Sequence, residues 1–144
     1  MKSPRNISSK TLKCDVAILG GGLAGGLIAL ALRRKRPELE VLVIEESATL
    51  GGNHIWSFFG PDVASEHRWL VAPLVCHGWR GYDVKFPGHE RALEESYYSI
   101  LSDRFDAYLR EELPAHHIVT GVRALAASQT NVVLENGARI EAGG

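Results

Sequence analysis

A glycine-rich loop near the start of the chain has the spacing of a phosphate-binding turn. It matches the pattern G-x-G-x-x-G and consists of six consecutive residues: Gly20, Gly21, Gly22, Leu23, Ala24 and Gly25. In such a loop the first glycine permits a sharp turn, the second lets the backbone touch a pyrophosphate, and the third lets a helix pack closely on a strand. The free N–H groups and positive dipole end of that helix attract phosphate. The loop therefore predicts nucleotide binding.

An acidic residue stands at the distance from this loop at which a ribose is bound. Glu45 lies twenty residues after Gly25, and a carboxylate there accepts hydrogen bonds from a ribose diol. Because the loop and the acid agree, a bound nucleotide is favoured over a tight turn that holds no ligand. Glu46 adds a second negative charge that would repel the 2′-phosphate of NADP.

A second pair of glycines bears on which nucleotide is bound. Gly51 and Gly52 follow Glu45 by six and seven residues, and they allow the backbone to approach the same cofactor. This extended contact favours FAD over NAD, while an ordinary pair of loop glycines is the alternative. His54 follows the pair and is either a flavin contact or a structural hydrogen-bond partner.

The elements around the loop form a strand–helix–strand unit. Asp15–Leu19 is a short apolar run typical of a buried parallel strand, and Leu23–Lys35 has apolar residues at helical spacing. Glu40–Glu45 is a second β-branched run, hence a second strand. The βαβ unit with its right-handed crossover predicts the fold class as α/β, a Rossmann-like FAD/NAD(P)-binding domain.

The remaining elements are predicted from apolar runs and turn signals. Three further strands are expected at Tyr82–Phe86, Tyr97–Leu101 and His117–Thr120. The strand at His117–Thr120 is expected to be parallel to the two strands of the strand–helix–strand unit. Ser102 is expected to N-cap a helix that Pro114 ends. Asn136-Gly137 predicts a β-hairpin. Val122, just after the third parallel strand, is expected to offer its backbone to an adenine.

Composition narrows the class of protein. The 144 residues are 45% hydrophobic and 23% charged, which excludes a disordered chain and a polytopic membrane protein. The net charge of −1 argues against a nucleic-acid partner. Cys14 and Cys76 form no CxxC pair and no two histidines stand at i, i+4 on a helix, so no metal site is expected. The glycines interrupt the apolar run 16–32, so no targeting or transmembrane segment is expected.

Two later blocks of sequence are more specific than the glycine loop. They read GGNHIWSFFG from Gly51 and WRGYDVKFPG from Trp79, and YYSILSDRF follows from Tyr97. Together with DVAILGGGLAGGLIALALR from Asp15, they make the chain similar to the bacterial lycopene beta-cyclase family. The resemblance assigns the glycine loop and Glu45 to that family's dinucleotide fingerprint. It also implies that four residues lie near the flavin: Gly51, Gly52, Asn53 and His54.

The resemblance implies an activity, a cofactor and a location. Family members convert the ψ-ends of lycopene into β-ionone rings by proton-initiated cyclisation, a net isomerisation. They use FAD in its reduced form, with NAD(P)H as the reductant. Their substrate is lycopene or a related acyclic carotenoid, and they are cytoplasmic proteins of bacteria that associate peripherally with the membrane. The carboxylic acid that protonates the polyene lies in a later region of the family, outside this chain.

The resemblance and the strand count also predict the domain organisation. We expect residues 1–14 to be a flexible arm and residues 15–144 to be the N-terminal portion of an FAD-binding domain. A substrate-side segment of about 53–101 is inserted in it, and the domain is cut before its last parallel strand. The aromatic residues of that segment either line a polyene site or pack a core. Two alternatives to a cyclase are an FAD/NAD(P)H-dependent oxidoreductase or hydroxylase and a non-catalytic nucleotide-binding fragment.

Overall fold

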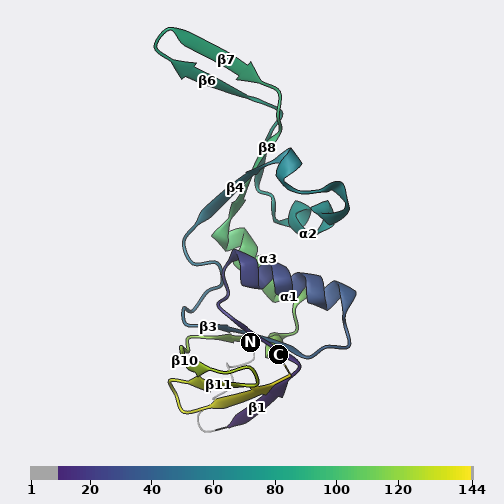
Figure 1. The fold of residues 1–144 in the computed structure, drawn as a ribbon, viewed down its shortest axis with the longest axis vertical. Helices are drawn as coiled ribbons and strands as arrows, with labels where there is room; N and C mark the ends of the chain where they lie inside the picture. The colour runs from purple at the N-terminus through teal and green to yellow at the C-terminus, as the bar shows by residue number, and fades with distance from the viewer. Residues whose placement is uncertain (1–9, 144) are drawn as a thin grey trace.

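A three-stranded parallel sheet lies between two helices and a second sheet in the computed structural model, which describes residues 10–143 (Figure 1). Its strand order is β2-β3-β9, with β2 at Val16–Leu19, β3 at Val41–Glu45 and β9 at Ile118–Thr120. Val16 is in register with Val41, and Val43 with Ile118. The carboxyl ends of the three strands therefore meet at one edge of the sheet, where Glu45 is the last residue of β3.

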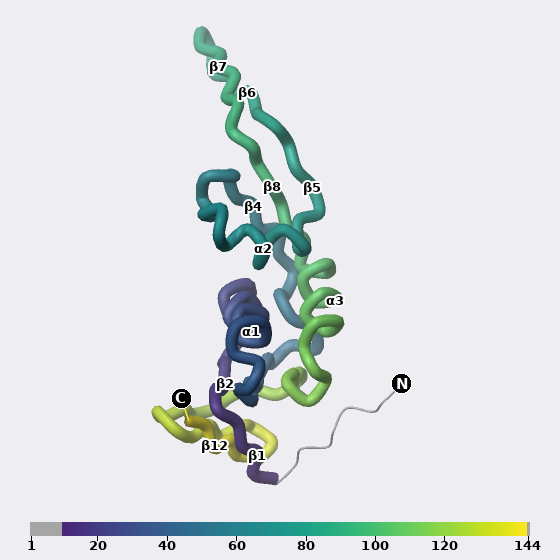
Figure 2. Tube along the Cα trace, turned by 90° about the vertical axis from the view of Figure 1, so that its right-hand side faces the viewer, coloured from purple at the N-terminus to yellow at the C-terminus, as the bar shows by residue number. Residues whose placement is uncertain are grey.

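Two helices cover one face of this sheet. They are α1, Leu23–Lys35, and α3, Ser102–Glu112, and they lie side by side (Figure 2). Val41 and Val43 point toward them and share a core with Phe105 and Leu109 of α3. The helices approach closely because Gly26 of α1 has no side chain: a Cβ there would overlap the ring of Phe105.

A second sheet covers the other face. Its strand order is β1-β12-β11-β10, and its strands are Thr11–Cys14, Arg139–Ala142, Asn131–Leu134 and Ala124–Ala127 in that order. Leu42 and Ile44 of β3 point toward it and pack in a core with Val132, Leu134 and Ile140. Alternate residues of β3 thus belong to different cores, and the body of the molecule has three layers.

The segment between β3 and α3 extends away from these layers. It contains a sheet of order β4-β8-β5, with strands at Ile55–Phe59, Tyr97–Leu101 and His77–Trp79. Beyond it, β6 at Tyr82–Phe86 and β7 at His89–Leu93 form a hairpin that projects from the molecule (Figure 1). The short helices are η1 at Gly60–Asp62, η2 at Ser65–His67, α2 at Arg68–Val71, η3 at Ala72–Leu74 and η4 at Ala115–His117.

The structure confirms most elements predicted from the sequence. The first helix and the strands at 82–86 and 97–101 have the predicted bounds. The βαβ unit and the third parallel strand are present. The Asn136-Gly137 turn joins β11 to β12, which pair antiparallel, and Gly137 has a positive φ of 83°.

Two expectations are corrected. Thr11–Cys14 belong to β1, which pairs in parallel with β12, and so do not form part of a flexible arm; Leu12 and Cys14 pack on the second core. Residues 1–9 of the expected arm lie outside the described part. Ser102 is not the N-cap of α3, because Leu101 holds that position and the Ser102 hydroxyl accepts a hydrogen bond from the His54 N–H instead.

Candidate nucleotide-binding site

The glycine loop connects β2 to α1 as a sharp turn at the carboxyl edge of the parallel sheet. Gly20 has a positive φ of 101°, which a residue with a side chain rarely adopts, and its N–H donates to the carbonyl of Ile44 at 2.8 Å. Gly22 is the N-cap of α1 and provides no side chain to the free N–H groups of the first turn. That turn carries no acidic residue either, so the helix end can receive an anion.

The three motif glycines have different packing requirements. A Cβ at Gly25 would overlap the carbonyl oxygen of Gly20, so glycine is needed there for the helix to approach the strand. A Cβ at Gly22 would meet no atom within 4 Å, so packing within the described chain does not require glycine. The open side of Gly22 is the cradle that a pyrophosphate needs for close contact with the backbone, and this geometry fits a dinucleotide.

Glu45 is fixed against the loop by its carboxylate. Oε2 accepts a hydrogen bond from the Gly21 N–H at 2.8 Å, and Oε1 accepts one from the Ser47 N–H at 2.9 Å. Burial acts to raise the pKa of Glu45, but the hydrogen bonds from Ser47 and Gly21 outweigh it, and the pKa is lowered. The group is therefore ionised at neutral pH. A carboxylate has about four lone-pair positions, so positions remain for a ribose diol.

Glu46 has a partner that the sequence did not indicate. Its carboxylate accepts a hydrogen bond from Nε of Arg123 at 2.8 Å, and both side chains are exposed. Because Arg123 offsets the charge of Glu46, most of the negative charge that would repel a 2′-phosphate comes from Glu45.

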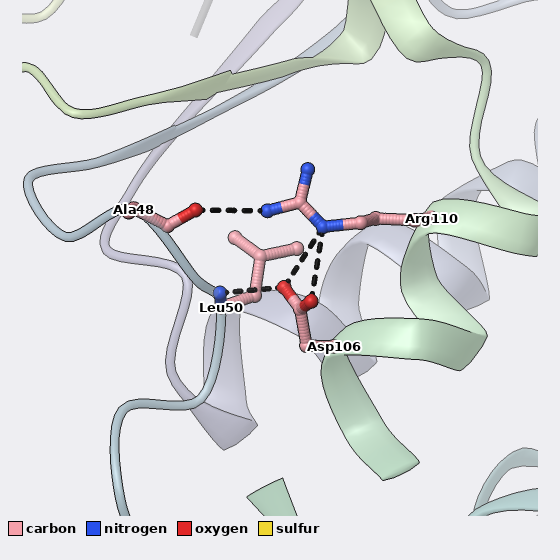
Figure 3. Close-up of polar contacts among 4 residues, drawn as sticks. All are labelled: Ala48, Leu50, Asp106 and Arg110. Atoms are coloured by element: carbon pink, nitrogen blue, oxygen red, sulfur yellow. Dashed lines mark hydrogen bonds and ion pairs between the residues drawn. The ribbon is translucent and has the colours of Figure 1, made fainter. Parts of the chain in front are cut away.

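The loop that carries the second glycine pair is attached to α3. Oδ1 of Asp106 accepts a hydrogen bond from the Leu50 N–H at 2.7 Å. Arg110 donates from Nε to both oxygens of Asp106 at 3.0 Å and from Nη2 to the Ala48 carbonyl at 3.1 Å (Figure 3). The loop then contacts the first glycine segment, where the Gly51 N–H donates to the carbonyl of Gly21 at 2.8 Å.

Both glycines of the second pair have positive φ, 79° at Gly51 and 60° at Gly52. Gly51 also lies against aromatic rings, since a Cβ there would stand 2.9 Å from Phe105 Cδ1 and 3.0 Å from Trp56 Cη2. Conformation and close packing therefore already require glycine at this position, independently of any ligand.

His54 and Asn53 end this loop with exposed side chains. The backbone of His54 is held by Ser102: its N–H donates to the hydroxyl at 3.3 Å, and its carbonyl accepts from the Ser102 N–H at 3.1 Å. The imidazole lies 5.8 Å from the Trp56 ring, centroid to centroid. The backbone contacts are structural, and the side chain remains accessible to a ligand.

Val122 lies beside Glu45, and its backbone N–H is already hydrogen-bonded within the protein. Its N–H donates to the backbone carbonyl of Glu45 at 3.3 Å, and its side chain is buried in the second core. The N–H of Val122 is therefore used in a hydrogen bond within the chain and is not free to donate to an adenine.

The structure thus brings together most of the residues that the sequence singled out, and it adds Asp106, Arg110 and Ser102. The i, i+4 spacing of Asp106 and Arg110 on a predicted helix indicates an ion pair between them. It does not indicate their hydrogen bonds to a loop far away in the sequence.

The sheet, the helices and the glycine turn define an α/β protein of the Rossmann-like class, as predicted. Similar folds occur in the tetrameric form of 2-methyl-3-hydroxypyridine-5-carboxylic acid oxygenase, with a TM-score of 0.66 and 19% identity over 92% of this chain and 38% of that one. A geranylgeranyl bacteriochlorophyll reductase-like protein from Thermoplasma acidophilum has a TM-score of 0.61 and 18% identity, over 92% of this chain and 38% of that one. At this identity the likeness concerns the fold alone.

The chain belongs to the lycopene cyclase family: the family described as "Lycopene cyclase protein" matches residues 15–143. The resemblance seen in the sequence is therefore confirmed. A lycopene beta-cyclase of Pseudescherichia vulneris is 50% identical over 100 residues, 69% of this chain and 26% of the relative. A lycopene beta-cyclase of Pantoea ananas is 44% identical over 103 residues, which are 71% of this chain and 27% of the relative. The chain thus spans about a quarter of the length of these relatives.

None of the helices within residues 10–143 has both the length and the apolar character needed to cross a bilayer.

Proposed function

We propose that the protein to which this chain belongs is a lycopene beta-cyclase, and that this chain supplies a large part of its nucleotide-binding domain. The observation that carries the proposal is family membership over residues 15–143, together with 50% identity to a relative of that name. The reaction is the closure of lycopene ψ-ends into β-ionone rings without net redox change.

We further propose that the domain binds FAD. The support is the geometry at the sheet edge: an open backbone at Gly22, the free N–H groups of α1 and an ionised Glu45. The start of α1 would hold the pyrophosphate, Glu45 the adenosine ribose, and the backbone at Gly52 would approach the cofactor from the neighbouring loop. When bound in its reduced form, with NAD(P)H as the reductant, the flavin would supply an electron-rich ring system for the cyclisation.

In this proposal the residues of the chain bind and orient the cofactor. They do not transfer the first proton to the substrate. Asp106 and Arg110 fix the loop that carries Gly51 and Gly52, so the cofactor meets a preformed surface. The lowered pKa of Glu45 favours its deprotonated form, which suits a hydrogen-bond acceptor for the ribose rather than a proton donor. We propose that the acid that protonates the polyene lies outside the residues of this chain.

The segment of about 53–101 is proposed to face the carotenoid. Aromatic rings gather on its three-stranded sheet and at the start of β6: Phe59 lies 5.0 Å from Tyr97 and 5.5 Å from Tyr82, and Trp79 lies 5.9 Å from Tyr97, centroid to centroid. Trp79 is exposed, so its ring is free for an apolar ligand. Trp56 differs, since it packs edge-on against Phe105 in the core. Aromatic faces also stabilise a carbocation through cation–π attraction.

Peripheral membrane contact is proposed for the projecting β6–β7 hairpin. Tyr82, Val84 and Phe86 alternate along β6 and so share one face, and Leu93 of β7 stands opposite Tyr82. Phe86 is 66% exposed near the turn. Arg91 stands opposite Val84 and His89 opposite Phe86, so the same face also carries two basic residue types. A projecting hairpin that combines exposed apolar side chains with basic ones suits contact with an anionic lipid surface, from which a carotenoid would be taken.

The experiment that tests the function uses the full-length protein in cells that accumulate lycopene. A cyclase produces pigments with β-ionone rings, and with purified protein it does so without stoichiometric consumption of NAD(P)H once the flavin is reduced. A hydroxylase or dehydrogenase instead consumes NAD(P)H or passes electrons in proportion to the product. A lack of any new pigment from a folded, flavin-loaded protein would reject the cyclase assignment.

A further inference from the structure

Three potential metal ligands meet at the edge of the parallel sheet opposite the glycine loop. Glu40 directly precedes β3, whereas His116 and His117 end η4 and directly precede β9. Since β3 and β9 are neighbouring parallel strands, their amino-terminal ends lie side by side. The cluster is therefore separated from Glu45 by the length of β3, and the nucleotide proposal makes no use of it.

The distances within the cluster suit a tetrahedral ion. Oε1 of Glu40 lies 3.1 Å from Nε2 of His116 and 3.5 Å from Nε2 of His117, and one ligand atom of each residue lies within 4.8 Å of the others. Zinc bonds of about 2.0–2.1 Å to nitrogen and oxygen in tetrahedral geometry place neighbouring ligand atoms about 3.3 Å apart. The two Glu40–histidine separations lie on either side of this value.

The backbone positions of the ligands are held by hydrogen bonds. The Glu40 N–H donates to Oδ2 of Asp15 at 2.8 Å, and the Glu40 carbonyl accepts from the Asp15 N–H at 2.8 Å. The His117 N–H donates to the carbonyl of Pro114 at 2.8 Å. Two of the three ligands therefore stand on anchored backbone, which lowers the entropic cost of assembling a site.

The cluster has one buried and two exposed ligands. The side chain of His117 is 8% exposed, whereas those of His116 and Glu40 are 48% and 54% exposed. The ion can therefore enter from the solvent, and a water can complete the coordination. Two imidazoles and one carboxylate suit zinc and similar ions, while magnesium and calcium prefer oxygen ligands.

We propose that Glu40, His116 and His117 form a binding site for a divalent transition-metal ion of the zinc type, with water as the fourth ligand. The ion would join the starts of β3 and β9, so its role is to brace the sheet. Helical i, i+4 spacing cannot reveal such a site, because the ligands come from two strand ends far apart in sequence.

The test is a metal titration of the full-length protein without a metal-binding tag. Co²⁺ is the spectroscopic probe, because tetrahedral Co²⁺ absorbs strongly in the visible, and Zn²⁺ affinity is measured against a chromophoric chelator. The variants are His116→Ala and Glu40→Gln, both at exposed side chains, and the matched control is His89→Ala on the projecting hairpin. Circular dichroism verifies that each variant is folded.

We expect the wild type to bind one ion and to show the tetrahedral Co²⁺ spectrum. Each ligand variant should bind Zn²⁺ at least about tenfold more weakly, since loss of even an outer-shell partner typically costs 10–100-fold, and His89→Ala should bind like the wild type. Absence of stoichiometric binding, or equal affinity in the wild type and His116→Ala, overturns the proposal. A Co²⁺ spectrum of octahedral type also overturns the proposed geometry.

Discussion

The Glu45 carboxylate and the Gly21 N–H form a hydrogen bond of 2.8 Å that joins the end of β3 to the turn after β2. The residue proposed to bind the ribose therefore also shapes the loop proposed to bind the pyrophosphate. A change at Glu45 is therefore expected to act on the cofactor both directly and through the loop.

Replacement Glu45→Gln should weaken FAD binding to the full-length protein by about tenfold or more, because a hydrogen bond to a charged acceptor contributes roughly 1.5–3 kcal/mol. The amide oxygen can still accept from one backbone N–H, so the loop should remain folded. Flavin fluorescence quenching during titration measures the affinity. Glu66→Gln, at an exposed acid on η2, is the control, and equal affinity in both variants would remove the ribose assignment.

Glu45 should also contribute to the dependence of stability on pH. Its pKa is lower in the folded chain than its usual value of 4.5, so the unfolded chain binds more protons in that range. The contribution is therefore fully present above about pH 4.5 and is lost as the pH falls through the lowered pKa of the folded state.

The measurement compares denaturant midpoints of the wild type and Glu45→Gln between pH 7 and pH 3. The wild type should have the higher midpoint at neutral pH, and the difference should shrink below about pH 4.5. A difference that stays constant over the whole range would show that the carboxylate charge does not matter for stability.

Gly22→Val and Gly25→Ala should fail in different ways. Valine at position 22 meets open space, so the fold should persist while flavin retention is lost, because the side chain blocks the pyrophosphate. Alanine at position 25 overlaps the Gly20 carbonyl, and overpacking of this kind costs typically 1–3 kcal/mol. Flavin absorbance after gel filtration and thermal unfolding distinguish the two. A Gly22→Val protein that retains its flavin contradicts the pyrophosphate assignment.

Asp106→Ala should loosen the loop between β3 and β4. The change removes the carboxylate that accepts the part-buried hydrogen bond from the Leu50 N–H and that pairs with Arg110. We expect this loss to lower the free energy of unfolding by about 2 kcal/mol. Asp106→Asn keeps an oxygen for Leu50 and should cost less, since a half-exposed ion pair contributes about 0–1 kcal/mol. Denaturant unfolding measures both, and limited proteolysis should cut the loop faster in Asp106→Ala. Equal stability of the two variants would show that the Leu50 contact contributes nothing.

Phe86→Asp should reduce binding of the full-length protein to lipid vesicles, because a charge near the hairpin turn opposes insertion into the acyl region. Co-sedimentation with phosphatidylcholine–phosphatidylglycerol vesicles measures the bound fraction. Leu125→Asp is the matched control: Leu125 is 63% exposed, close to the 66% of Phe86, but it lies on β10 at the far end of the molecule (Figure 1). A similar loss in both variants would indicate general repulsion rather than a hairpin contact.

Local signals in the sequence were sufficient for the elements that local forces determine. The bounds of α1 follow from helical spacing between a glycine N-cap and the basic residues before Pro37, and the hairpin follows from Asn136-Gly137. The distance from Gly25 to Glu45 reflects the length of one strand–helix–strand unit, so it too could be read from the chain.

The features that were missed depend on pairing between distant segments. β1 is four residues long, and its partner β12 lies near the other end of the chain. Ser102 has the residue type of an N-cap, but its hydroxyl is engaged by the His54 N–H. Asp106 looks like one half of an ordinary helix ion pair, yet it also holds Leu50. No spacing rule identifies such partners, because the fold brings them together.

The parallel pairing of β1 with β12 also has a consequence for how the chain folds during synthesis. β1 leaves the ribosome first, but its partner and the neighbouring β11 follow only after α3 and β9 have been made. Until then Leu42 and Ile44 of β3 lack the sheet that covers them in the native state. Such long-range pairing slows folding and leaves apolar surface exposed in intermediates, so these two side chains stay uncovered on the nascent chain until β11 and β12 have emerged.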